Sequence, residues 1–132
     1  MMSSKTRHSE PDERVAKAEK LLEEGKTKYE ALEDLEKELG TIKRASEGCE
    51  NVFHSLVEVS EAILSKHGQT ARNHIERMDK LSKIGRGDLA DLYAIAKDHL
   101  HTSGYYGQQF NTIQKHTLER VEKKVKEEIE KL

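Results

Sequence analysis

The side chains best suited to catalysis or ligand binding lie in one short stretch, Lys97-Asp98-His99-Leu100-His101-Thr102-Ser103-Gly104-Tyr105-Tyr106. An imidazole at a helix C-terminus is favoured by the helix dipole, which raises its tendency to hold a proton. Tyrosine rings can cover the edge of a core or stack on bases, and histidine can contact a phosphate or a 2′-hydroxyl. The stretch therefore predicts either a structural bundle end or a ligand surface for RNA or a nucleotide. The ligand-binding candidates are Tyr93, His99, Tyr105 and Tyr106.

The seven histidines do not have the spacing of a metal site. Di-iron helical bundles use Glu-x-x-His on two helices, whereas this sequence has no Glu-x-x-His and a single Asp98-x-x-His101. Glu50 and His54 are four residues apart and could share a helix face, but His99 and His101, two apart, point in different directions on a helix. We predict no bound metal and no cofactor, with the histidines in structural or surface roles.

Motifs for covalent catalysis and phosphate loops are missing from the sequence. Cys49 is the only cysteine, and it falls in the middle of an apolar helical stripe, where a thiol gains no activation from a helix N-terminus. Gly85-Arg86-Gly87 lacks the Lys-Ser/Thr of a P-loop and predicts a flexible turn. The triplet Arg72-Asn73-His74 lies at the start of the predicted third helix. Its side chains could hydrogen-bond the preceding loop, or they could form a small functional polar cluster near the end of the bundle.

These groups must be positioned by helices. The chain has one proline in 132 residues, and Ala, Glu, Lys, Leu and Arg dominate it, as in helical proteins. We predict an all-α fold, an up-and-down four-helix bundle with an additional short helix. Residues 1–10 are expected to form a flexible N-terminal segment ahead of a single domain over 11–132. Apolar residues recur at helical spacing in five segments, 11–39, 42–67, 71–83, 88–101 and 110–132.

The richest apolar face predicts that residues 42–67 form the central helix. Gly40-Thr41 predicts a break or kink before it. Thr70 and Asp88 are expected to cap the third and fourth helices, and Gly104 and Gly107 to bracket the tyrosine pair in an irregular loop. Helix-spaced apolar positions in the third and last helices are Ile75, Met78, Leu81, Ile113, Leu118, Val121, Val125, Ile129 and Leu132.

Composition excludes several functional classes. The net charge of −2 and the pI of about 6.4 argue against a large basic face for nonspecific nucleic-acid binding. No apolar run approaches the ~20 residues that span a bilayer, and the first ten residues lack the apolar core of a secretory signal. We expect a cytoplasmic protein with no membrane association. Because only 34% of residues are hydrophobic, the apolar faces are narrow and predict completion by a second copy in a homodimer.

The order of elements over Val15–Leu132 resembles the HEPN superfamily. This family comprises small up-and-down four-helix bundles from prokaryotic toxin–antitoxin, defence and uncharacterised gene pairs. The most telling segment is Leu92–Tyr106, where Leu-His-x-x-Gly-Tyr-Tyr is similar to the His-Tyr region of the family. The resemblance implies a homodimer and a nucleotidyltransferase as a partner protein.

Active HEPN ribonucleases carry arginine, four to six residues, then histidine, and cleave RNA without a metal, with the 2′-hydroxyl as nucleophile. His101 matches the histidine, but residues 94–96 are Ala-Ile-Ala, and none of the seven arginines has a histidine at the required spacing. Lys97 is one residue too close and lacks the guanidinium fork. Without the arginine, the protein would lack the positive charge that stabilises the pentavalent phosphate. Electrostatic stabilisation of this kind usually contributes most to catalysis.

The sequence therefore predicts a non-catalytic HEPN-like helical bundle that acts as a binding or protein-interaction module. The alternatives are a divergent metal-independent ribonuclease or toxin, or a nucleotide-binding protein, that uses His101 with Lys97 or Tyr105 as auxiliary groups. His101 and Lys97 are accordingly the catalytic candidates.

Overall fold

The computed structural model describes residues 2–34 and 39–132, and the side chains of residues 11–30 and 42–132. These residues form helices and turns and contain no strand, so the predicted all-α class is confirmed. The elements are α1 (Met2–Asp34), α2 (Leu39–Lys66), α3 (His74–Lys83), α4 (Gly87–Ala96), the π-helix η1 (Lys97–Tyr106) and α5 (Thr112–Lys131).

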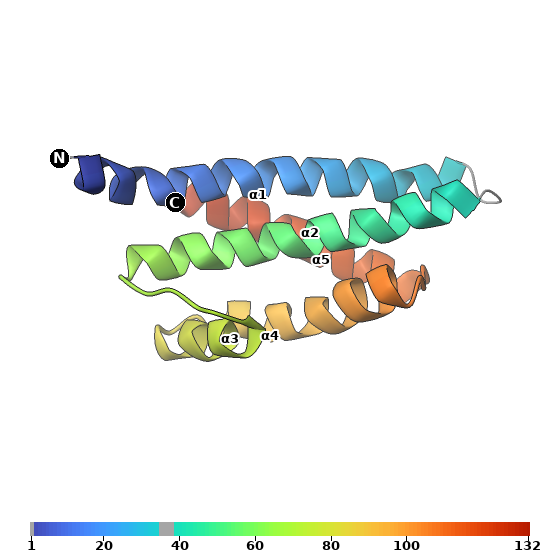
Figure 1. Ribbon diagram of the computed structural model, residues 1–132. Coiled ribbons are helices and arrows are strands. Elements are labelled where there is room, and N and C mark those ends of the chain that lie inside the picture. The colour runs from blue at the N-terminus through green and yellow to red at the C-terminus, as the bar shows by residue number, and fades with distance from the viewer. Residues whose placement is uncertain (1, 35–38) are drawn as a thin grey trace.

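The helices are arranged around α2. Figure 1 shows α1 running beside α2, while α3, α4 and η1 lie on its other side. Helix α3 packs against α4, and η1 continues α4. Helix α5 lies behind α2 in this view and packs against α1, α2, α4 and η1. The two chain ends lie towards the same end of the molecule.

The middle of α2 is enclosed from every side. Residues 55–64 are buried without interruption, and they include the polar residues Ser55, Glu58, Ser60 and Glu61. A helix buried all round is typical of the centre of a fold, so the prediction that 42–67 is the central helix is confirmed. Cys49 is also fully buried, and burial raises the pKa of its thiol to about 12. The thiol is therefore protonated and unreactive at neutral pH.

The backbones of α1 and α2 come into close contact at Gly25 and Gly48. A Cβ on Gly25 would lie 2.7 Å from the Gly48 carbonyl oxygen, and a Cβ on Gly48 would lie 2.6 Å from the Gly25 carbonyl oxygen. Only glycine fits at such a crossing. Gly25 costs about 1 kcal/mol relative to alanine within an isolated helix, and the close backbone contact explains its presence.

The ends of α1 and α2 differ from the sequence prediction. The helix begins at Met2 and not at Pro11, so helical backbone extends through residues 2–10, and Pro11 lies inside α1 without contributing an N–H group. Gly40, the predicted break, falls in the first turn of α2. The connection between the two helices lies outside the described residues.

Two other helix starts are set by asparagine caps. Asn73, not Thr70, caps α3, because its side-chain oxygen accepts the Glu76 N–H at 2.8 Å. Asn111 caps α5 in a capping box with Gln114, as expected for a helix starting near residue 110. Helix α4 starts at Gly87, one residue before the predicted cap Asp88, which instead lies in the first turn.

The predicted irregular loop around Gly104 and Gly107 is wrong. Residues 97–106 continue α4 as a π-helix, and the Gly107 N–H donates to the Thr102 carbonyl, five residues earlier, at 2.8 Å. A Cβ on the buried Gly104 would lie 2.8 Å from Cys49 Sγ, so this glycine permits close packing of η1 on α2. The Ser46 hydroxyl of α2 donates to the carbonyl oxygens of Gly104 and Tyr105, at 3.3 and 3.2 Å.

Two of the predicted apolar positions face solvent. Ile75 is 76% exposed and Ile113 is 55% exposed, whereas Leu81 is fully buried. Both isoleucines lie at the beginning of a helix, where the first turn extends past the core. None of the helices in the described part of the chain is long and apolar enough to cross a membrane.

Candidate functional site

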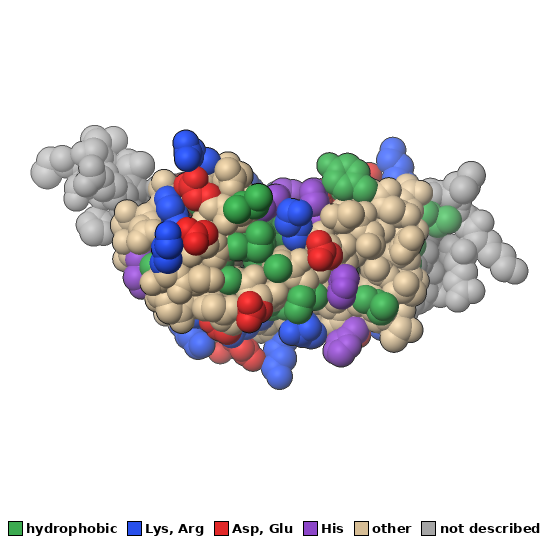
Figure 2. Space-filling view, turned by 90° about the horizontal axis from the view of Figure 1, so that it is seen from below, with side chains coloured by type: hydrophobic (Ala, Val, Ile, Leu, Met, Phe, Trp, Pro, Cys, Tyr) green, Lys and Arg blue, Asp and Glu red, His purple; other side chains and the backbone are tan. Residues whose placement is uncertain are grey.

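Three histidines from three different elements meet around one phenylalanine. His54 of α2, His74 of α3 and His101 of η1 have ring centroids 5.9, 5.4 and 5.2 Å from that of Phe53. We call these three residues the histidine cluster. Phe53 is fully buried and forms its floor, while the side chain of His54 is 47% exposed. Figure 2 shows histidine side chains in a hollow at the upper edge of the view, with hydrophobic side chains on both sides.

His101 is held by a carboxylate of α2. Its Nδ1 lies 2.7 and 3.0 Å from the two carboxylate oxygens of Glu50. An ionised carboxylate only accepts hydrogen bonds, so Nδ1 carries a proton and donates it. The free nitrogen is therefore Nε2, which offers a lone pair in the neutral ring and a second N–H in the charged ring. Glu50 also lies 3.9 Å from Nε2 of His54.

The tautomer of His74 is set by Tyr93 and Arg77. The Tyr93 hydroxyl is hydrogen-bonded to His74 Nδ1, and Arg77 Nη1 donates to this hydroxyl at 2.8 Å and lies 3.3 Å from Nδ1. Arginine has no acceptor atom, so the hydroxyl accepts from Arg77 and turns its own proton to His74. Nδ1 is thus an acceptor, and the proton of the neutral ring is on Nε2.

The surroundings of His74 also keep it uncharged. Burial lowers its pKa, and the positive charges of Arg77, His101, Lys97 and His54 lower it further. His74 is therefore a neutral N–H donor near neutral pH.

A buried ion pair anchors this arrangement. Arg77 Nε donates to Glu61 Oε1 at 2.6 Å, and the two side chains are 10% and 8% exposed. Tyr93 is fully buried, and burial raises its pKa. Tyr93 was a ligand-binding candidate, but its ring belongs to the core and its hydroxyl positions His74.

The structure brings most of the other candidates to His101. The rings of Tyr105 and Tyr106 lie 6.5 and 5.0 Å from that of His101, and Tyr106 is 70% exposed. Lys97 is close enough for its charge to act on His74, and it forms no ion pair with any described side chain. His101 thus shares one site with the tyrosine pair, and the charge of Lys97 acts on the neighbouring His74.

His99 lies on the other side of η1. Its Nδ1 is 2.7 Å from Thr117 Oγ1 of α5, and its ring lines a separate hollow with His116 and Arg120. The two histidines point in different directions, as their spacing of two residues predicts on a helix. His99 is therefore not part of the histidine cluster.

Sequence reasoning missed the partners of His101. Spacing joined Glu50 with His54 on one helix face but linked neither of them to His74 or His101, and neither Phe53 nor Arg77 was a candidate. Arg77 is an arginine beside the histidines that comes from α3, so a search at a fixed distance before His101 could not find it. The available signal was the three-residue spacing of His74 and Arg77, which places them on one helix face.

The chemical character of the cluster follows from its donor atoms. Among the described residues, no group of three or more His, Cys, Asp or Glu side chains could hold a metal ion. The cluster offers two imidazole Nε2 atoms, a nearby ammonium and an exposed phenol ring. Comparison of the chain with family models, curated proteins and solved structures finds no match. The resemblance to the HEPN superfamily stays a prediction.

Proposed function

We propose that this protein is a binding module that holds a phosphate group of RNA or of a nucleotide at the histidine cluster. The observation that carries the proposal is the pairing of His74 and His101. Their ring centroids lie 5.8 Å apart, and each ring has its Nδ1 bonded to the protein. Both Nε2 atoms are thereby left for a ligand in fixed orientations, which limits the ordering cost of binding.

Phosphate matches the donors of the cluster. Phosphate oxygens only accept hydrogen bonds, and His74 supplies an Nε2–H in its neutral form. His101 supplies a second N–H when its ring is charged, and Glu50 faces that charge at 2.7 Å. Lys97 adds a positive charge.

The tyrosine pair supplies a surface for bases. Tyr105 and Tyr106 have ring centroids 4.8 Å apart, and Tyr106 is largely exposed next to His101. Unpaired bases stack on exposed aromatic rings, with about 1–3 kcal/mol per base. Single-stranded RNA is therefore preferred over a duplex, whose bases are not available for stacking.

A direct test is fluorescence anisotropy with a short labelled single-stranded RNA. His101→Ala removes one charge-assisted hydrogen bond, so we expect binding at least about tenfold weaker. His99→Ala is the matched control on the same element, and its affinity should stay within about twofold of the wild type, because His99 faces α5. Absence of binding by the wild type, or equal losses in the two variants, would contradict the proposal.

Metal-independent RNA cleavage is the second candidate, favoured by the bond between Glu50 and His101. A carboxylate on Nδ1 orients an imidazole whose Nε2 then serves as a general base. The 2′-hydroxyl would pass its proton to His101 Nε2 as its oxygen attacks phosphorus, and the 5′-oxygen would leave with a proton from water. The products would be a cyclic phosphate and a 5′-hydroxyl.

Glu50→Gln separates binding from cleavage. The amide oxygen of glutamine can still accept the His101 Nδ1–H, so the ring stays oriented and RNA binding should be retained. Nε2 loses the basicity that the carboxylate gives it, so cleavage in the presence of EDTA should fall. If concentrated wild-type protein leaves RNA intact, the binding function stands without the catalytic one.

We also propose that the helices have the HEPN-like four-helix arrangement, that the protein forms a homodimer, and that its partner protein is a nucleotidyltransferase. Ile75, next to His74 in sequence, and Tyr106 are large hydrophobic side chains exposed on the described surface, and their burial would favour a dimer. Light scattering at micromolar concentration tests it, and a species of 15.1 kDa would contradict it.

A further inference from the structure

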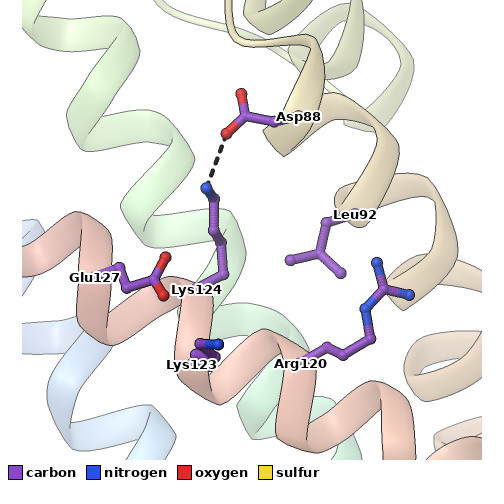
Figure 3. Close-up of a pocket in the computed structure, with 6 residues that line it drawn as sticks. All are labelled: Asp88, Leu92, Arg120, Lys123, Lys124 and Glu127. Atoms are coloured by element: carbon purple, nitrogen blue, oxygen red, sulfur yellow. Dashed lines mark ion pairs between the residues drawn. The ribbon is translucent and has the colours of Figure 1, made fainter.

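A second hollow lies between α4 and α5. It has a volume of about 380 Å³ and is lined by Asp88, Leu92, Arg120, Lys123, Lys124 and Glu127. We call it the α4–α5 groove. Figure 3 shows the Leu92 and Arg120 side chains extending into the space between the two helices, while Lys124 reaches across to Asp88. The volume falls within the ~300–1,000 Å³ of small-molecule sites.

Positive charge exceeds negative charge in this groove. Lys124 is neutralised by Asp88, with 2.8 Å between Nζ and Oδ2. Arg86 and Lys124 hold the pKa of the Asp88 carboxyl well below its usual range, so this carboxylate stays ionised. Arg120 and Lys123 form no ion pair with any side chain that the structure describes, and Glu127 is the one remaining acidic group of the lining. The groove therefore carries an unbalanced positive charge.

The basic side chains follow one face of α5. His116, Arg120, Lys123 and Lys124 stand at spacings of four, seven and eight residues, which places them in a row about 12 Å long. Arg120 also lines the adjoining hollow of about 200 Å³ that contains His99 and His116. The Arg120 guanidinium is thus the shared element of two adjacent hollows.

We infer that the α4–α5 groove binds a phosphomonoester of nucleotide size, independently of the histidine cluster. The planar guanidinium of Arg120 suits two oxygens of one phosphate group, and Lys123 supplies a second positive charge next to it. The terminal phosphate of a monoester carries up to two negative charges, which the unbalanced cations match. Leu92 provides an apolar surface for the organic part of the ligand. A phosphate group with an attached sugar and base is therefore held better than inorganic phosphate.

The test is a titration of ¹⁵N-labelled full-length protein followed by amide shifts. The probes are adenosine 5′-monophosphate, ribose 5-phosphate, inorganic phosphate and adenosine. We expect saturating shifts in residues 88–92 and 120–127, tightest with the nucleotide, weaker with the sugar phosphate and inorganic phosphate, and none with adenosine. Arg120→Gln should weaken nucleotide binding at least about tenfold, as expected for loss of a bidentate charged contact. Lys126→Gln is the matched control, because it removes one α5 charge that pairs with Glu122 at 2.9 Å instead of lining the groove.

The outcomes separate the two sites. Shifts in 88–92 and 120–127 that persist in His101→Ala support a groove ligand whatever happens at the histidine cluster. No saturable shift in these segments at millimolar nucleotide overturns the inference. Equal affinities of Arg120→Gln and Lys126→Gln overturn it as well, and so do shifts confined to the residues around His101.

Discussion

The two sides of η1 differ in how their polar side chains are held. On the side of the histidine cluster, Glu50 holds His101, and Tyr93 with Arg77 holds His74. On the side of the α4–α5 groove, Arg120 and Lys123 are exposed and have no ionic partner among the described side chains. The cluster is therefore preorganised, while the groove presents exposed, unpaired charges to solvent.

This difference has consequences for energetics. In a buried network of hydrogen bonds and ion pairs, removal of one side chain leaves another buried and unpaired, which lowers the stability of the fold. Ligand binding and stability therefore depend on the same side chains. Exposed charges contribute little to stability, and their attraction for a ligand is screened by salt. Substitutions in the cluster should thus change both stability and binding, whereas substitutions in the groove should change binding only.

The largest expected effect is that of Arg77→Met. Removing the guanidinium leaves Glu61 buried without its partner, and breaking such a pair costs about 3–5 kcal/mol. Urea unfolding measures the loss. Arg72→Met is the matched control, because Arg72 pairs with Glu76 on the surface, where an ion pair contributes little to stability. A double variant with Glu61→Met should recover much of the stability, and equal effects of the two single variants would contradict a special role for Arg77.

The next effect is that of Gly104→Ala. The added Cβ would lie 2.8 Å from Cys49 Sγ, and overpacking of this kind costs about 1–3 kcal/mol. Because η1 must move away from α2, RNA binding through His101 should weaken as well. Cys49→Ala in the same chain removes the sulfur and should restore part of both losses. If Gly104→Ala is as stable as the wild type in thermal unfolding, the close packing of η1 is not required.

A smaller effect concerns pH. The pKa of His74 is lowered in the folded state, chiefly by burial, so the unfolded chain binds this proton more readily. Above the unfolded pKa of about 6.5, His74 is neutral in both states and does not reduce the free energy of unfolding. As pH falls below that value, the unfolded chain takes up the proton first and the free energy of unfolding decreases. His74→Gln should flatten the decline of unfolding free energy between pH 7 and 5. Equal slopes in the wild type and in His74→Gln would refute the assignment.

The smallest effect on stability is expected for Arg120→Gln. Its side chain is exposed and makes no ion pair with the described residues, so the unfolding free energy should change by no more than about 0.5 kcal/mol. The same urea titration as for Arg77→Met measures it. A loss of several kcal/mol would show that Arg120 supports the fold, and the contrast between the two sides of η1 would disappear.

The sequence predicted the helices well where the apolar residues at helical spacing are also the residues buried in the core. The apolar stripe of residues 42–67 identified the central helix, and Cys49, which falls within that stripe, is fully buried. The pattern failed at η1, because Gly104 serves close packing against Cys49 and does not end a helix. Sequence cannot distinguish these two roles of glycine without knowing which helix lies opposite.

The candidate site was predicted in part. The stretch 97–106 supplied His101 and the tyrosine pair, because these residues are neighbours in sequence. Glu50 and Arg77 reach the site from α2 and α3, and only the packing of those helices brings them there. Spacing motifs find groups on one element and miss groups assembled from several.

The most direct test of the central claim is a titration with single-stranded RNA that follows the imidazole signals of all seven histidines in one experiment. Binding at the histidine cluster is expected to shift the signals of His54, His74 and His101 and to leave those of His67, His99 and His116 in place. Unchanged cluster signals at saturating RNA, or shifts confined to the histidines outside the cluster, would contradict the account.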